Sequence, residues 1–329
     1  MNNIPRNWTL RLLIAVTALA MAPFVNAYPV GSVFTINSAT SNLKLKASVF
    51  GFSGEDTNDL TGSLNVTLDF GASGFGTPGK VTVNSGTITP SGDYSLTVGL
   101  PPFLGVNAVT SNLAADVSTP SPPGTMTRTA GPSVVYEIDS SQFLVTMDQG
   151  TVVVTGSANE TIDLAAEPVE GSSPPGTLGT LTLTTGGTSG YFTLVNAALS
   201  LPVDVTETAD LGGLAVDMQV TGTVNASSSF YVALQGIPGD FQLDGDIDSS
   251  DLPLWKTGFG LATGATPNNG DANADGLVDG ADFLIWQRNH GIQPPPIAAS
   301  AVAVPEPAAI GSCIVALAAV AMARRLMER

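Results

Sequence analysis

The chain has 329 residues, and its 28 acidic residues outnumber its 11 basic residues, which gives a formal net charge of −17. A chain this acidic lacks the basic surface that nucleic-acid binders need, so that function class is excluded. One Cys allows no intrachain disulfide and no CxxC zinc site, and one His allows no multi-histidine metal site.

Residues 1–27 have the features of a secretory signal peptide. Arg6 and Arg11 precede an apolar run over residues 12–22, and Val25-Asn26-Ala27 forms a cleavage site before Tyr28. A transmembrane anchor, the alternative, needs about 20 apolar residues, and this run is shorter. We therefore expect cleavage after Ala27 and export of the mature chain.

Residues 304–329 combine three features in a fixed order. Val304-Pro305-Glu306-Pro307 is followed by the uncharged residues 308–323 and then by a basic tip that begins at Arg324. Such a run would form a short membrane helix, and the charges behind it would keep that end in the cytoplasm. This order resembles the PEP-CTERM sorting signal of Gram-negative bacteria, which implies processing by a membrane enzyme of the exosortase type. A plain C-terminal anchor is the alternative.

Residues 28–236 predict a domain built almost entirely of β-strands. Leu64–Phe70 alternates apolar and polar residues, which is typical of a strand with one solvated face. Clusters rich in Pro and Gly at 120–124 and 172–176 indicate turns. We expect an all-β, sandwich-like antiparallel domain with many short strands, among them 43–47, 64–70, 94–98, 134–138, 143–147, 151–155, 180–184, 214–220 and 230–234.

This domain offers few catalytic candidates. Residues 28–236 contain no His and no Cys, so nucleophilic catalysis that depends on either is excluded there. Its scattered carboxylates leave acid–base hydrolysis of glycosides open, although no pair has a distinctive context. Six aromatic residues are candidates for a sugar-stacking face, but we expect them to pack within the domain: Tyr94, Tyr136, Tyr191, Phe192, Phe230 and Tyr231.

Residues 240–260 and 271–291 are two copies of one repeat, offset by 31 residues. The offset superposes identical residues at seven pairs of positions: Asp240/Asp271, Asp244/Asp275, Gly245/Gly276, Asp248/Asp279, Asp251/Asp282, Trp255/Trp286 and Gly260/Gly291. Acids at positions 1, 5, 9 and 12 of a twelve-residue loop, with Gly at position 6, form the ligand pattern of an EF-hand-type calcium loop. Without a cation, carboxylates crowded in this way would repel one another.

The repeats therefore predict two calcium ions, one in each loop. At position 7, Asp246 and Leu277 would each contribute a backbone carbonyl. Gln242 replaces the usual Asp or Asn at position 3, so the first loop should bind more weakly than the second. The complete predicted ligand set is Asp240, Gln242, Asp244, Asp246, Asp248 and Asp251 in the first loop, and Asp271, Asn273, Asp275, Leu277, Asp279 and Asp282 in the second.

Each loop is preceded by helix-breaking residues and followed by a helical pattern, with Pro253 in the first turn of one helix. This tandem of loop–helix units resembles a type I dockerin domain over 237–292. The resemblance implies pseudo-twofold packing, folding on calcium and docking to a cohesin. Contact positions 10 and 11 hold Ser249-Ser250, which fit a cohesin partner, and Gly280-Ala281, which do not. His290 aligns with Phe259, and we interpret it as a packing residue.

The sequence thus predicts five segments: a signal peptide (1–27), the all-β domain (28–236), the dockerin-like domain (237–292), a Pro/Ala linker (293–303) and the sorting signal (304–329). Cys313, inside the last apolar run, is interpreted as a small hydrophobic residue. Three functions remain open. They are a non-enzymatic protein of the cell envelope or extracellular matrix, a carbohydrate-binding module, and a polysaccharide-degrading enzyme.

Overall fold

The computed structural model describes residues 29–70, 79–100, 104–131, 133–156, 159–211, 214–233 and 236–297. Residues 1–295 form one compact unit and residues 296–329 a second. The predicted signal peptide, the sorting signal and Cys313 lie outside the described residues. Within those residues, no helix is long and apolar enough to cross a membrane.

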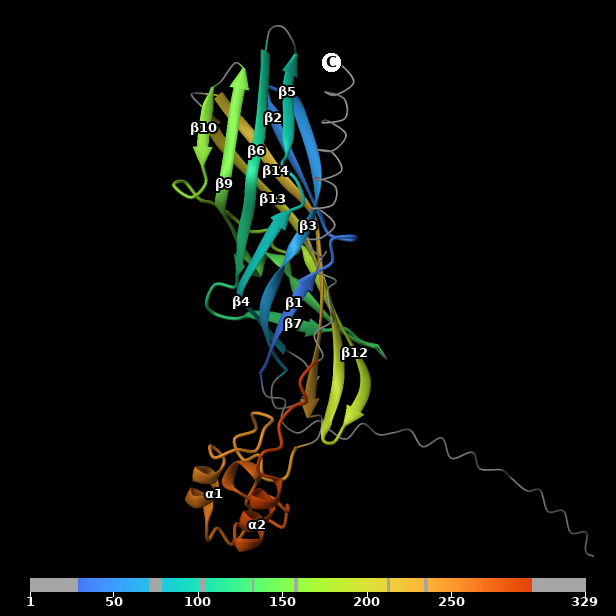
Figure 1. Ribbon diagram of the computed structural model, residues 1–329, viewed down its shortest axis with the longest axis vertical. Helices are drawn as coiled ribbons and strands as arrows, with labels where there is room; N and C mark the ends of the chain where they lie inside the picture. The colour runs from blue at the N-terminus through green and yellow to red at the C-terminus, as the bar shows by residue number, and fades with distance from the viewer. Residues whose placement is uncertain are drawn as a thin grey trace, which may run out of the picture. The chain divides into compact units, whose positions relative to one another are not determined.

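The chain from Val30 to Ala233 is mainly β (Figure 1), as the sequence predicts. Its described strands are β1 Val30–Ile36, β2 Asn42–Val49, β3 Phe52–Asp69, β4 Gly79–Pro90, β5 Ser95–Leu100, β6 Leu104–Ser118, β7 Gly124–Arg128, β8 Val134–Asp139, β9 Leu144–Gly156, β10 Glu160–Asp163, β11 Val169–Gly171, β12 Leu178–Ser189, β13 Phe192–Leu211 and β14 Leu214–Ala233. A single 3₁₀ turn, η1 Ser140–Gln142, separates β8 from β9.

All the described strands belong to one antiparallel hydrogen-bonded sheet. Twelve of them follow the order β1-β3-β2-β14-β13-β12-β8-β7-β4-β6-β9-β10, while β5 pairs with β6 and β11 pairs with β9. Further pairings of β1 with β14 and of β3 with β4 link strands that are not neighbours in this order. Hydrogen bonding therefore does not divide the domain into the two separate sheets of a simple sandwich.

Several strands are much longer than the sequence predicts. Residues 144–147 and 151–155, expected in two strands, lie in the single strand β9, and residues 214–220 and 230–233, also expected in two, lie in β14. The pairing of β9 with β6 continues past Gly150 through a shift in register. Residues that often form turns are therefore accommodated inside strands, where an irregular ladder absorbs them.

Alternation along these strands fills two separate apolar cores. The larger core contains 26 buried residues from β1 to β14, including the fully buried Phe34, Tyr136 and Leu181. The smaller core gathers Leu45, Val49, Tyr94, Leu96, Val98 and their neighbours around β2 and β5. Each large side chain fully removed from water contributes about 1.5–3 kcal/mol, so these two clusters are the main source of stability in the domain.

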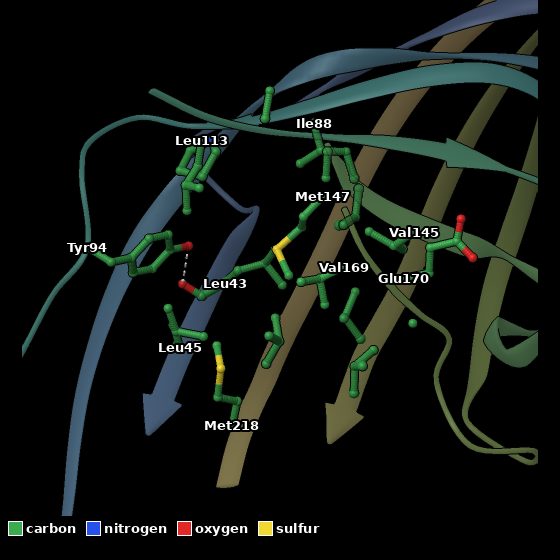
Figure 2. Close-up of a pocket in the computed structure, with 18 residues that line it drawn as sticks. Leu43, Leu45, Ile88, Tyr94, Leu113, Val145, Met147, Val169, Glu170 and Met218 are labelled. Carbon is green, nitrogen blue, oxygen red and sulfur yellow. Dashed lines mark hydrogen bonds between the residues drawn. The ribbon is translucent and has the colours of Figure 1, made fainter. Parts of the chain in front are cut away.

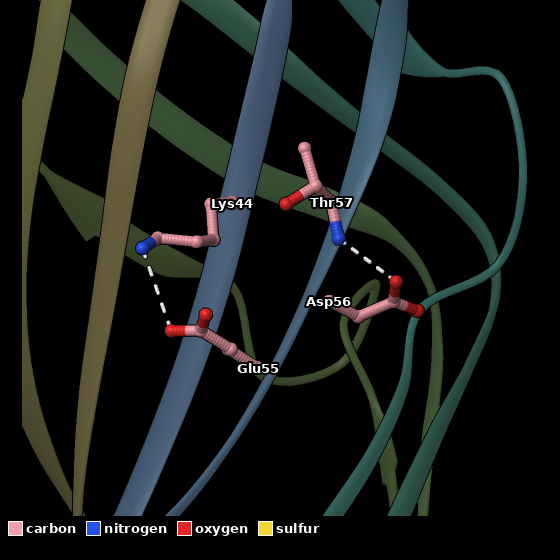
Figure 3. A network of polar contacts seen from close by, with 4 residues as sticks. All are labelled: Lys44, Glu55, Asp56 and Thr57. Carbon is pink, nitrogen blue, oxygen red and sulfur yellow. Dashed lines mark hydrogen bonds and ion pairs between the residues drawn. The ribbon is translucent and has the colours of Figure 1, made fainter.

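Polar contacts of β2 and β3 contribute less. Lys44 Nζ lies 3.4 Å from Glu55 Oε2, and both side chains are exposed (Figure 3), so solvent screens this ion pair. The Asp56 carboxylate accepts hydrogen bonds from the backbone N–H of Thr57 at 2.8 Å and of Ser95 at 2.8 Å. Asp56 therefore links β3 to the start of β5.

The remaining described helices lie in the predicted calcium repeats. Helix α1 Leu252–Gly258 follows the first loop, and α2 Gly280–Asn289 follows the second, with the 3₁₀ turn η2 Pro267–Asn269 between them. Pro253 occupies the first turn of α1, where its missing N–H costs no helical hydrogen bond. Residues 293–297, at the start of the predicted linker, form neither helix nor strand.

Candidate metal centre

Two carboxylates hold the first loop in a closed conformation. Asp240, at position 1, accepts hydrogen bonds from the N–H of Leu243 at 2.7 Å and of Gly245 at 3.0 Å. Asp251, at position 12, accepts from the N–H of Phe241 at 2.7 Å and of Asp248 at 2.9 Å. The two ends of the loop are therefore tied to its middle, and both carboxylates are almost completely buried.

The second loop repeats this arrangement. Asp271 accepts from Ala274 N at 2.7 Å and from Gly276 N at 2.9 Å. Asp282 accepts from Ala272 N at 2.9 Å and from Asp279 N at 2.8 Å. Every donor in the second loop lies 31 residues after its counterpart in the first, so the repeat in the sequence is also a repeat in hydrogen bonding.

The turn in each loop depends on left-handed backbone conformations. Gly245 has φ 92° and Gly276 has φ 82°, values that favour a residue without a Cβ. Two residues before each of them, Leu243 and Ala274 adopt φ 63° and φ 60°. The N–H groups of this turn point at the position-1 carboxylate, so the glycine predicted at position 6 shapes the loop.

The predicted ligands at positions 3 and 5 are exposed in both loops. Gln242 donates a hydrogen bond to the Asp244 carboxylate, and Asn273 donates one to Asp275 at 2.9 Å. Leu277, predicted to contribute its carbonyl, has a side chain that is 37% exposed.

Both acids at position 9 accept a hydrogen bond from the backbone N–H two residues later. Asp248 accepts from Ser250 N at 2.6 Å in the turn before α1, whose N-cap is Asp251, and Asp279 accepts from Ala281 N at 2.7 Å as the N-cap of α2. The position-3 amides therefore lie beside the position-5 carboxylates, and the position-9 carboxylate of the second loop lies where loop and helix meet.

The structure places the side-chain carboxylate of Asp246, which was predicted to contribute only its backbone carbonyl, beside the other acids of the first loop. Carboxylate oxygens of Asp246, Asp248 and Asp251 all lie within 4.8 Å of one another. One oxygen of Asp246, Oδ1, is buried and has no hydrogen-bond partner within the described part of the chain. The loop pattern uses position 7 only for its backbone carbonyl, whereas here its side chain joins the acidic group. The one signal in the sequence was that position 7 holds Asp in the first loop and Leu in the second.

Burial raises the pKa of three carboxyl groups in the first loop. Removal from water raises the pKa of Asp240 to about 7, and the nearby Asp251 carboxylate adds to this effect. Burial also raises the pKa of Asp251 and of Asp246, and the neighbouring carboxylates raise the pKa of Asp246 further. A bound cation would offset this repulsion, and hard oxygen donors at this spacing fit Ca²⁺.

The two repeats are braced against each other. Trp286, in the second repeat, donates its indole N–H to the carbonyl of Asp248 in the first at 3.0 Å, and Trp255 donates to the carbonyl of Asp279 at 2.9 Å. Ile247 exchanges backbone hydrogen bonds with the Gly291–Ile292 segment, and Val278 does the same with Gly260–Leu261. Each loop is thus supported by the segment that contains or follows the helix of the other repeat.

The lone histidine takes no part in either acidic group. The His290 ring lies edge-on to Trp286, with ring centroids 5.1 Å apart. Phe259 contacts Trp255 at 5.0 Å in the matching place. The rings of His290 and Phe259 are both exposed, so these are contacts at the surface of the repeats.

The β-domain provides no comparable group of acids. The buried acidic residues of the described chain are Asp240, Asp251, Asp271 and Asp282, which hold positions 1 and 12 of the two loops. Of the six aromatic residues considered for sugar stacking, four are buried: Tyr94, Tyr136, Phe192 and Phe230. Packing therefore accounts for these four side chains.

Comparison with known proteins identifies no family. No protein-family model matches the chain, and no curated protein matches it. One similar solved structure is the crystal structure of Ail, the attachment invasion locus protein of Yersinia pestis, in complex with the heparin analogue sucrose octasulfate. It aligns with 61% of this chain and 99% of the Ail chain, at 9% identity and a TM-score of 0.18. A TM-score this low carries no argument about fold or function.

Proposed function

We propose that residues 237–292 form a type I dockerin-like module that binds two calcium ions, one in each loop. Positions 1, 3, 5, 7, 9 and 12 hold the ion, and position 7 of the first loop has a side-chain carboxylate beside the others. The observation that carries the proposal is that all four buried acids of the described chain occupy positions 1 and 12. Calcium neutralises this buried charge, so its binding stabilises the folded loops.

The wider proposal is that the chain is a non-enzymatic, exported protein of the cell envelope or extracellular matrix. Residues 1–27 direct its export, and the PEP-CTERM tail at 304–329 passes it to an exosortase-type sorting enzyme, with the apolar run in the membrane before processing. The dockerin-like module then attaches the protein to a cohesin-like partner. Ser249 and Ser250, at contact positions 10 and 11 of the first loop, are exposed and accessible to such a partner.

The alternative is a protein that binds or degrades polysaccharide, in which the β-domain contacts the sugar. Four of the six candidate rings are buried and offer no stacking face, which favours the non-enzymatic proposal, whereas Tyr191 is 43% exposed and Tyr231 is partly buried. Release of sugar from a polysaccharide, abolished by one Asp or Glu substitution in residues 28–236, would favour the alternative.

Calorimetric titration of the mature chain with calcium tests the module. We expect two ions per chain, and one ion when Asp271→Asn and Asp282→Asn are combined. Asp163→Asn is the matched control, because Asp163 is exposed in the β-domain and should leave both ions bound. Binding of no calcium, or of two ions by the double variant, would refute the ligand assignment.

Attachment is tested separately. The mature protein, immobilised, is incubated with an extract of the envelope and matrix of its own cells, with calcium or with chelator. A cohesin-like protein should be retained in calcium alone, and Ser249→Asp with Ser250→Asp should abolish its retention. If the partner is retained equally in chelator and by the double variant, the attachment role is contradicted. The calcium assignment does not depend on this result.

A further inference from the structure

The β-domain contains an apolar cavity of about 110 Å³, which Figure 2 shows with the side chains around it. Its walls come from β2, β4, β6, β9, β11, β13 and β14, and from Tyr94 just before β5. Leu45 and Tyr94 on its wall belong to the smaller core, whereas Ile88 and Val224 belong to the larger one. The cavity therefore lies where the two cores of the domain meet without filling the space between them.

The wall offers almost no polar chemistry. Of the eighteen residues that line the cavity, Glu170 is the only charged one. The Tyr94 hydroxyl donates its hydrogen bond to the carbonyl of Leu43 at 3.1 Å (Figure 2), so its donor is already used within the wall. A cavity lined in this way gives water few partners, and apolar cavities of similar size, roughly 150 Å³, stay dry and take up molecules such as benzene.

Part of the cavity wall, at β11, is exposed to solvent. This strand has only three residues and pairs with β9 alone, while the Val169 side chain is 36% exposed and Glu170 is exposed. At Gly171, a Cβ would lie 2.6 Å from a methyl carbon of Val205, so a larger residue here would displace the Val205 side chain from the wall. A short strand with an exposed carboxylate thus forms this part of the wall.

We infer that this cavity binds the end of an alkyl chain that carries an uncharged head group. The apolar wall selects the chain, and the volume limits it to a short segment. Glu170 and the net charge of −17 disfavour a carboxylate head at this part of the wall. This site is independent of the calcium module, and it should bind equally well with chelator present.

Two methionines make the site directly observable, and a third serves as an internal control. Met147 and Met218 line the cavity, whereas Met126 is fully buried in the larger core and does not line it. The full chain, purified without detergent and labelled with ¹³C at the methionine methyl groups, is titrated with hexan-1-ol. We expect saturable shifts of the Met147 and Met218 signals in the millimolar range, and none at Met126.

Two ligands and three variants complete the test. Hexanoate should bind about fivefold more weakly than hexan-1-ol because its charge meets Glu170. Ala115→Leu should fill the cavity and abolish the shifts. Leu113→Ala should enlarge the cavity and preserve the methionine shifts. This variant still tests the inference if Ala115→Leu does not fold. Ala165→Leu, in an exposed turn outside the cavity, should change nothing.

The inference is overturned if Met147 and Met218 do not shift. It is equally overturned if Met126 shifts with them, because that would mean a general solvent effect. Binding of hexanoate at equal or higher affinity would refute the preference for an uncharged head group.

Discussion

Each repeat of the proposed calcium module donates an indole hydrogen bond to the other repeat, and Trp286→Phe removes one of these two bonds. The substitution keeps an aromatic ring in place but deletes the N–H that donates to Asp248 O at 3.0 Å. A neutral hydrogen bond of this kind contributes about 1 kcal/mol, and its loss leaves the Asp248 carbonyl without that partner. Because Asp248 belongs to the first loop, the affinity of the first loop should fall about fivefold.

The assay compares the two loops one at a time. Asp271→Asn with Asp275→Asn leaves the first loop as the calcium site, and Asp240→Asn with Asp244→Asn leaves the second. Calcium titration by calorimetry then measures each loop with and without Trp286→Phe.

Trp255→Phe is the matched control, since its indole donates to Asp279 in the second loop and should weaken that loop instead. If Trp286→Phe weakens only the second loop, which belongs to the same repeat as Trp286, the hydrogen bonding between the repeats does not support the first loop.

Three further predictions concern single side chains. Asp271→Ala should lower calcium affinity far more than Gln242→Ala, because Asp271 is buried and holds two backbone N–H groups whereas Gln242 is exposed; equal affinities in calcium titrations would contradict this. Burial, with a smaller contribution from Asp56, raises the pKa of Tyr94 to about 12, whereas the unfolded chain loses this proton near pH 10. The stability that Tyr94 contributes is therefore present below pH 10 and lost between pH 10 and 12. The free energy of unfolding in urea should differ less between pH 8 and pH 11 for Tyr94→Phe than for the wild type. An equal difference would refute this. Lys44→Ala should cost about 0.5 kcal/mol or less in urea unfolding, because its ion pair with Glu55 is exposed, and a loss above about 2 kcal/mol would mean that solvent does not screen the pair.

Much of the metal centre is predictable from the sequence because its geometry is local. Asp240 and Gly245 are five residues apart, and the hydrogen bond between them at 3.0 Å is set by that spacing and by the left-handed turn that glycine permits. The identical spacing from Asp271 to Gly276 then predicts the second loop. Only the side chain of Asp246 was missed, because the loop pattern uses position 7 for its carbonyl.

The β-domain was predictable in class but not in detail. Alternating residues identify strands such as β8, but a local pattern does not say whether a polar or glycine residue ends a strand or lies inside it. Gly150 lies within β9 because β6 continues to pair on both sides of it. The apolar cavity could not be predicted from the sequence either. Residues as distant in the chain as Leu43 and Val224 come together in its wall only when the sheet has formed.

The central claim is that residues 237–292 fold around calcium. Circular dichroism of the mature chain, recorded in calcium and again after chelation, tests it most directly. The account predicts that chelation removes the helical signal of α1 and α2 while the β signal of residues 28–236 persists, and that added calcium restores it. Identical spectra in calcium and in chelator would contradict it.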